Sequence, residues 1–255
     1  MILWSIFVGR GGDMAEPDEL ASGSVGALTY KPAPGETLVP QTLSFVLAQL
    51  PAWRDDPARP AHSNENQMNS SLCDFLATQS RTNFPMVRFK HQDLQTTTHT
   101  VDLGVHGLEK ITIVDTHGYS IYQPFLVIEA KRLPAPSKDR EREYVAGAGK
   151  PSGAIERFRL GLHGAGVETA AIVGYIESET PEYWHSTVNR WISTTFTRTG
   201  AQSCTWAKAD ELSNLAFDEE CGTSSSESNH ERVGKCCTRS IMIRHLWVVM
   251  NWQKR

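Results

Sequence analysis

The chain has 255 residues, 40% of them hydrophobic, so it can bury one large core or two small ones. Its formal net charge of -4 and pI near 6.1 argue against a protein that coats nucleic acid through overall charge. Five cysteines, an odd number without regular spacing, favour a reducing cytoplasm over a disulfide framework. We therefore expect a soluble, cytoplasmic protein without a membrane partner.

The first 62 residues are predicted to form a poorly structured or peripheral N-terminal arm. Residues 9 to 64 are rich in Gly, Pro, Ala and acidic residues, with one periodic segment, Thr42 to Leu50, that suits a short helix. The apolar start, Met1 to Val8, is too short to span a bilayer. Met14 offers an alternative start. The folded domain is expected to occupy residues 63 to 255.

The first helix of that domain is predicted to begin near residue 63, with Ser63 or Asn64 as its N-cap. Its apolar side chains share one helical face: Met68, Leu72, Phe75 and Leu76. Glu65 lies on this apolar stripe. The helix dipole by itself favours an acidic residue in the first turn. What points to a site is therefore the predicted inward direction of Glu65.

Strands are predicted at Met86 to Lys90, Thr100 to Val105, Phe125 to Lys131, Thr169 to Ile176 and Ile241 to Trp252, with a hairpin arm at Ile111 to Val114. Helices are predicted over Ile155 to Leu162 and from Pro181, capped by Thr180. This order predicts one α/β domain with a mixed central sheet and helices on both faces.

The tripeptide Glu129-Ala130-Lys131 ends a predicted buried strand. Strand side chains alternate, so Glu129 and Lys131 share one face. Buried charges are costly unless they have each other, a metal or a ligand. In the strand before, Asp102 alternates with core residues and should face the same groove. A structural ion pair at the strand end is the alternative.

The segment from Lys131 to Arg159 holds eight basic residues against four acidic ones. It supplies four candidate contacts to a phosphate backbone: Arg132, Arg142, Arg157 and Arg159. A solvated loop and helix face is the alternative. Farther on, Cys221, His230, Cys236 and Cys237 have no C-x-x-C pair, so the Ser-rich stretch 223 to 228 is interpreted as a plain loop and not as part of a zinc site.

An Asp in one strand and Glu-x-Lys in the next, within an α-β-β-β-α-β order over Ser63 to Ile176, resemble the PD-(D/E)xK nuclease superfamily, which has the restriction-endonuclease-like fold. One departure is Val101, where that superfamily often has proline. The resemblance implies that Asp102, Glu129 and the carbonyl of Ala130 hold Mg²⁺ (Mn²⁺ substituting), and that Glu65 adds to the metal shell. It also implies that Lys131 sits beside the attacking water.

The function expected from the resemblance is Mg²⁺-dependent endonuclease cleavage of DNA, in defence or DNA processing, with double-stranded DNA as partner and a homodimer as one possible state. One alternative is a catalytically silent nuclease-fold protein that binds nucleic acid or a protein. Another is an assembly protein in which Glu129 and Lys131 form only an ion pair, with four tryptophans as core or interface anchors: Trp184, Trp191, Trp247 and Trp252.

Overall fold

The computed structural model describes residues 37–61, 64–95, 99–114, 117–148, 150–195, 205–233 and 235–253. The first half of the chain forms α1 (Leu38–Arg54), α2 (Glu65–Asn83), β1 (Val87–Leu94), β2 (Thr100–Gly107), β3 (Ile111–Val114), β4 (His117–Ser120) and β5 (Leu126–Leu133). The second half forms the 3-10 helix η1 (Lys138–Tyr144), α3 (Ala154–Arg159), β6 (Thr169–Ile176), α4 (Pro181–Thr195), the 3-10 helix η2 (Lys208–Asp210), β7 (Ala216–Asp218), β8 (Thr223–Glu231) and β9 (Ser240–Val249).

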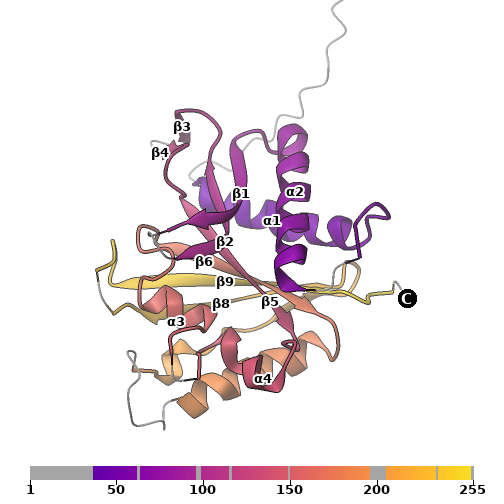
Figure 1. Cartoon of the computed structure of the whole chain (residues 1–255), viewed down its shortest axis with the longest axis vertical. Coiled ribbons are helices and arrows are strands. Elements are labelled where there is room, and N and C mark those ends of the chain that lie inside the picture. The colour runs from indigo at the N-terminus through magenta and orange to yellow at the C-terminus, as the bar shows by residue number, and fades with distance from the viewer. Residues whose placement is uncertain are drawn as a thin grey trace, which may run out of the picture.

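A mixed seven-stranded sheet forms the centre, in the order β1-β2-β5-β6-β9-β8-β7. Strands β5, β6 and β9 run parallel, and the pairs outside them run antiparallel. Strands β3 and β4 form a separate hairpin. Helices α1 and α2 lie on one side of the sheet, and α3 and α4 on the other (Figure 1). The predicted α/β class with a mixed, helix-flanked sheet is therefore confirmed.

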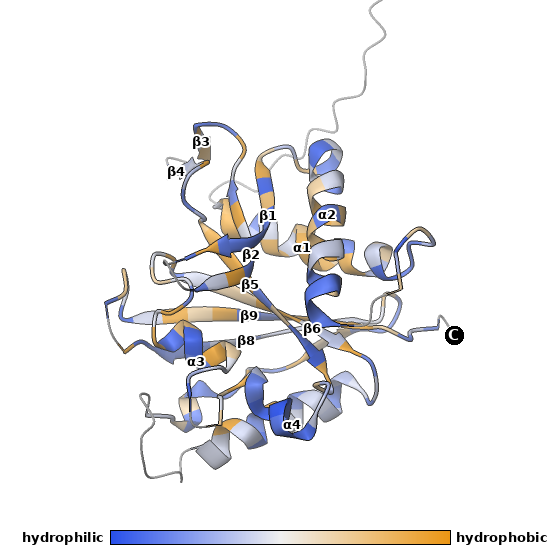
Figure 2. Cartoon of the chain, in the orientation of Figure 1, coloured by the Kyte–Doolittle hydropathy of each residue, from blue (hydrophilic) through white to orange (hydrophobic). Residues whose placement is uncertain are grey.

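The sheet separates two hydrophobic cores, one beneath α1 and α2 and the other beneath α3 and α4. Figure 2 shows hydrophobic strand segments at the centre, between helices that carry both kinds of residue. Strand β5 contributes to both cores, because Leu126 and Ile128 face the first and Val127 and Leu133 the second. Its alternation thus places Glu129 and Lys131 on the α3 side of the sheet.

Helix α1 lies inside the predicted N-terminal arm and yet belongs to the first core. Leu38, Val46 and Trp53 are almost fully buried there. The folded unit therefore includes Leu38–Arg54, which lies before the predicted boundary at residue 63, and the helix expected from Thr42 to Leu50 is longer at both ends. Burial of the i, i+4 stripe against the sheet stabilises this helix more than its local composition does. Residues 1–36 lie outside the described residues.

The interpretation of residues 223 to 228 as a loop is wrong, because they begin β8, which pairs with β9 along its whole length. The strand lacks apolar alternation, and what alternates along most of it is burial: Ser226, Ser228 and His230 are buried, whereas Asn229 and Glu231 are exposed. Hydrophobic patterning cannot reveal a strand whose inward side chains are polar.

The other predicted elements are present, β3 and β6 with the predicted bounds and the rest with one or both ends shifted. Asn64 caps α2, since its Oδ1 accepts from the Gln67 amide at 3.0 Å. Thr180 caps α4 by accepting from the Tyr183 amide at 3.2 Å. Helix α3 ends at Arg159 and does not reach Leu162. Among the described residues, no helix combines the length and apolarity needed to cross a membrane.

Candidate functional site: a charged cluster where β2 and β5 separate

Strands β2 and β5 are paired only from Val105–Leu126 to Leu103–Ile128. Beyond that point, the amide of Ala130 is the next one on β5 that faces β2. It donates a hydrogen bond to Oδ2 of Asp102 at 2.8 Å. An extended residue directs its N–H and C=O to the same edge, so the Ala130 carbonyl also points into this gap. The sheet thus splits at the predicted motif, and a carboxylate replaces the lost strand pairing.

Glu65, in the first turn of α2, meets the same edge of β5. Its Oε2 accepts from the Arg132 amide at 3.1 Å, and its Oε1 accepts from Nζ of Lys131 at 3.0 Å. The predicted inward direction of Glu65 is therefore confirmed. Both of its oxygens are used, so Glu65 anchors the first turn of α2 to β5 and orients the lysine.

Lys131 also lies near Glu129, with 3.8 Å between Nζ and Oε2. On the other side of this carboxylate, Nδ1 of His163 lies 2.6 Å from Oε1. Glu129 and His163 are 2% and 1% exposed. We call Glu65, Asp102, Glu129, Lys131 and His163 the split-strand cluster. Sequence reasoning assigned no role to His163, which follows α3 in a loop and has no motif of its own.

The electrostatics of the split-strand cluster are crowded. Burial and, next, the negative charge of Glu129 together raise the pKa of Asp102 to about 7, although Lys131 and the hydrogen bond from the Ala130 amide lower it. Burial opposes the charged form of Lys131, but Glu129, Asp102 and Glu65 together hold its pKa above the ordinary value. Burial likewise opposes the charge on Glu129, but His163 and Lys131 keep its pKa below the usual range. The ammonium is the counter-charge of the site.

The cluster fits a hard divalent cation in the type of its donors, because carboxylate and carbonyl oxygens are the ligands such ions take. Within the described ranges, no three His, Cys, Asp or Glu side chains are already placed to hold a metal ion together. Oε1 of Glu129 is nevertheless buried without a well-aligned hydrogen-bond partner among the described residues. A bound cation would neutralise part of the negative charge of the three carboxylates, for which Lys131 is the main counter-charge.

The four predicted phosphate contacts differ in availability. Arg142 is exposed, and Arg157 is partly exposed and close enough to act electrostatically on Glu129. Arg132 is partly buried and pairs with both oxygens of Glu177, at 2.9 and 2.6 Å. Arg159 does not fit the prediction: its side chain is 2% exposed, bonds to Asp210 and lies 4.5 Å over the Trp206 ring.

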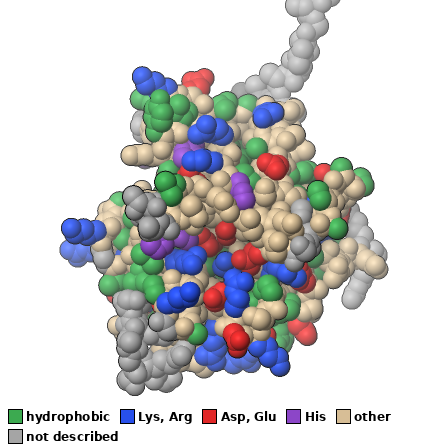
Figure 3. Space-filling model, in the orientation of Figure 1, with side chains coloured by type: hydrophobic (Ala, Val, Ile, Leu, Met, Phe, Trp, Pro, Cys, Tyr) green, Lys and Arg blue, Asp and Glu red, His purple; other side chains and the backbone are tan. Residues whose placement is uncertain are grey.

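A pocket of about 470 Å³ opens beside Glu65, and it is lined by Asn64, Glu65, Asn66, Arg132, Pro136 and Arg140. Figure 3 shows acidic, basic and histidine side chains mingled on the part of this face between α2 and α3. Arg140, which sequence reasoning passed over, places a second guanidinium at this pocket. Of the cluster only Glu65 lines this pocket, so the pocket brings two guanidinium groups to the edge of the cluster.

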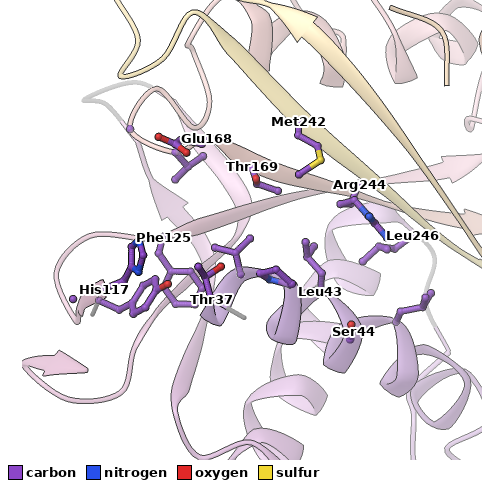
Figure 4. Close-up of a pocket in the computed structure, with 17 residues that line it drawn as sticks. Thr37, Leu43, Ser44, His117, Phe125, Glu168, Thr169, Met242, Arg244 and Leu246 are labelled. Carbon is purple, nitrogen blue, oxygen red and sulfur yellow. The ribbon is translucent and has the colours of Figure 1, made fainter. Parts of the chain in front are cut away.

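A separate pocket of about 550 Å³ lies at the other end of the parallel strands. It is formed by α1, the β4 hairpin and the starts of β6 and β9, with Leu43, Phe125, Thr169 and Met242 among its lining (Figure 4). Its walls are mostly apolar, and no residue of the split-strand cluster lines it. It therefore adds nothing to the chemistry of the cluster.

A second polar group is buried beneath the α4 side of the sheet. Nδ1 of His230 lies 2.9 Å from Asp210, and its Nε2 lies 2.7 Å from Oγ of Ser228. Oγ of Ser228 is 2.8 Å from Nε2 of His245, whose Nδ1 is 2.7 Å from the Tyr144 hydroxyl. The indole of Trp247 donates to that hydroxyl at 2.8 Å. We call these six residues the β8–β9 chain.

Both ends of the β8–β9 chain impose the same proton order. Trp247 can only donate, and ionised Asp210 can only accept. Tyr144 therefore donates to His245, His245 to Ser228, Ser228 to His230, and His230 to Asp210. Both imidazoles are then neutral, which agrees with burial lowering the pKa of His230 and of His245. Every polar group along the chain has its partner.

Ser228, His230 and Asp210 have the spacing of a nucleophile, a base and an orienting acid. The serine, however, is 2% exposed, and its hydroxyl already serves both imidazoles. A substrate carbonyl has no access to such an oxygen. The β8–β9 chain therefore tethers β8, β9, η1 and η2 together and is not a hydrolase site.

Fold and site together define an α/β protein with a seven-stranded mixed sheet and a carboxylate–lysine cluster where that sheet splits. No family model, no curated protein and no solved structure matches this chain. The resemblance to the PD-(D/E)xK superfamily therefore stays a prediction.

Proposed function

We propose that this chain is a metal-dependent nuclease that hydrolyses phosphodiester bonds in DNA, in a defence or DNA-processing role. The observation that carries the proposal is the convergence of α2, β2 and β5, which bring Glu65, Asp102, Glu129 and Lys131 to one split in the sheet. A binding surface has no need to bury three carboxylates around one ammonium, because such burial is costly.

In the proposed mechanism, Asp102, Glu129 and the carbonyl of Ala130 would hold Mg²⁺, or Mn²⁺ in its place. A divalent ion held there would lower the pKa of a water molecule and offset charge on the phosphate. Lys131 stays protonated among its carboxylates, so it orients the water and stabilises a phosphate oxygen and does not act as a base. Glu65 fixes the ammonium through its 3.0 Å hydrogen bond.

DNA would approach over the basic segment that follows β5. Arg142 and Arg157 are the exposed and partly exposed candidates for phosphate contacts, and Arg132 and Arg140 line the pocket beside Glu65. Guanidinium groups suit phosphates because their donors form a planar fork. Arg159 is not one of the proposed phosphate contacts, because its side chain is buried and paired with Asp210.

One observation favours the silent alternative, a protein of this fold that binds nucleic acid or a protein without cutting. Asp102 and Glu65 already serve backbone amides of β5, and Lys131 already balances their charge. Such a cluster can stabilise the split in the sheet without a metal. Binding of DNA in the absence of metal-dependent cleavage would favour this alternative.

The test is cleavage of supercoiled plasmid and of labelled linear DNA with Mg²⁺ or Mn²⁺, by wild type and by Lys131→Ala. Loss of a positioned charge in the site should lower cleavage by about 100-fold or more. Lys150→Ala removes an exposed lysine from the same basic segment and should cut like wild type. Equal cutting by wild type and Lys131→Ala, or none by wild type on any substrate, would overturn the proposal.

A further inference from the structure

The contact between His163 and Glu129 has the length of an ion pair but not the alignment of a hydrogen bond. Nδ1 and Oε1 are 2.6 Å apart, yet both are buried without a hydrogen-bond partner of good geometry among the described residues. A proton on Nδ1 would lie off the line to the oxygen, and without that proton two lone pairs would face each other. Buried polar atoms are seldom left in this state, and those that are need an explanation.

The backbone of the loop after α3 positions His163 beside Glu129. Helix α3 ends at Arg159, and the chain then reverses through Gly161 and Gly164, whose φ values are +68° and +61°. These values lie in the left-handed region that other residues rarely adopt. A Cβ on Gly164 would come within 2.8 Å of Val127, so only glycine lets the loop approach β5 this closely. The result is that His163 is held against Glu129.

The two atoms are spaced much as neighbouring ligands of one ion. Ligands in cis positions on an octahedral ion with bonds of about 2.1 Å lie about 3 Å apart, a few tenths of an ångström more than the observed separation. Oε1 is the oxygen of Glu129 that faces away from Lys131, whose Nζ lies 3.8 Å from Oε2. A cation beside this pair, bound to both Oε1 and Nδ1, would therefore have one carboxylate oxygen and one imidazole nitrogen as ligands.

We infer that His163 is a further ligand of the cation at the split-strand cluster, through Nδ1, and that the site prefers Mn²⁺-type transition-metal ions to Mg²⁺. Magnesium favours oxygen ligands and keeps its waters, whereas imidazole suits first-row transition metals. The inference rests on the cation site of the proposed nuclease, but it concerns which ion binds and not whether DNA is cut.

The binding experiment is calorimetric titration of the metal-free full-length protein with MnCl₂ and with MgCl₂, for wild type, His163→Asn and His117→Asn. Asparagine keeps a hydrogen-bonding atom at the δ position but lacks the imidazole nitrogen. Wild type should bind Mn²⁺ at least about 10-fold more tightly than Mg²⁺, and His163→Asn should reduce that ratio to about 3-fold or less. The exposed His117 is the matched control and should leave the ratio unchanged.

A second measurement needs no variant, which matters if His163→Asn fails to fold. Electron spin-echo envelope modulation of the Mn²⁺-loaded wild type should detect coupling of the Mn²⁺ electron spin to one imidazole nitrogen. Absence of that coupling, or a Mn²⁺-to-Mg²⁺ ratio in His163→Asn equal to that of wild type, would overturn the inference even if DNA is cut. Metal selectivity that depends on His163 in a protein that cuts no DNA would support the inference and sink the nuclease proposal.

Discussion

The split-strand cluster lies where β2 and β5 separate, whereas the β8–β9 chain is buried beneath the α4 side of the same sheet. The two groups of buried polar side chains differ in how their charges and hydrogen bonds are balanced. The β8–β9 chain is neutral at both imidazoles and gives every donor an acceptor, from Trp247 to Asp210. The split-strand cluster crowds carboxylates around Lys131, pushes the pKa of Asp102 to about 7 and leaves Oε1 of Glu129 without an aligned partner.

The difference separates a structural network from a candidate site. A satisfied buried network contributes rigidity and offers nothing to a ligand, because each of its groups would lose a bond by binding one. A crowded cluster of carboxylates stores unfavourable electrostatic energy that a bound cation can relieve. The charged cluster is thus the site to test, although the β8–β9 chain contains the more familiar Ser-His-Asp spacing.

The largest effect is expected from breaking the β8–β9 chain at its centre with His245→Phe. The phenyl ring fills nearly the same space but removes one hydrogen-bond partner each from the buried Tyr144 hydroxyl and the Ser228 hydroxyl, which should lower the free energy of unfolding by about 3 kcal/mol. Urea denaturation followed by tryptophan fluorescence measures this. Metal binding by the protein that remains folded should be unchanged, and a loss of metal affinity would contradict the separation of the two regions.

A smaller effect of opposite sign is expected from Asp102→Asn. Because the folded protein holds a proton on Asp102 up to about pH 7, where the unfolded chain has released it, wild-type stability falls as pH rises from about 4 to about 7. Asparagine does not titrate, so the variant lacks this loss of stability with rising pH. Its side-chain oxygen can still accept the hydrogen bond from the Ala130 amide. In EDTA, the variant should exceed wild type by about 1–2 kcal/mol at pH 8.

The control for that measurement is pH itself together with a second variant. Asp102→Asn and wild type should unfold at nearly the same urea concentration at pH 4.5. The exposed Asp139→Asn should follow wild type at both pH values. If Asp102→Asn is less stable than wild type at pH 8, the cluster is not crowded in the way described, and the comparison with the β8–β9 chain loses its basis.

The smallest effect concerns the arginines around the two regions. Arg142→Ala removes an exposed charge near the split-strand cluster and should weaken DNA binding about 2- to 5-fold, less than about 1 kcal/mol, while flattening its salt dependence. Fluorescence anisotropy at two salt concentrations measures both quantities.

Arg159→Lys should instead lower stability through the lost contacts with Asp210 and Trp206, and a selective loss of DNA binding in that variant would reverse the assignment.

Local pattern was a good guide wherever an element buries mainly apolar side chains. Strand β6 has the predicted bounds, Thr169–Ile176, and Asn64 and Thr180 cap the helices that follow them. The pattern failed at β8, whose buried side chains are serines and a histidine, because their burial depends on partners from η1, η2 and β9. It also placed α1 outside the domain, since the packing of Trp53 depends on distant strands.

For the candidate site, the sequence by itself determined the positions of Glu129 and Lys131 on one face of a strand and the inward direction of Glu65, since helical and strand periodicities are local properties. Tertiary structure alone decided that β2 and β5 separate beside Asp102, that His163 meets Glu129 and that Arg159 is buried. The physical reason is that side chains 28 to 66 residues apart meet only through the pairing of strands and the reversal of loops, which no local period encodes.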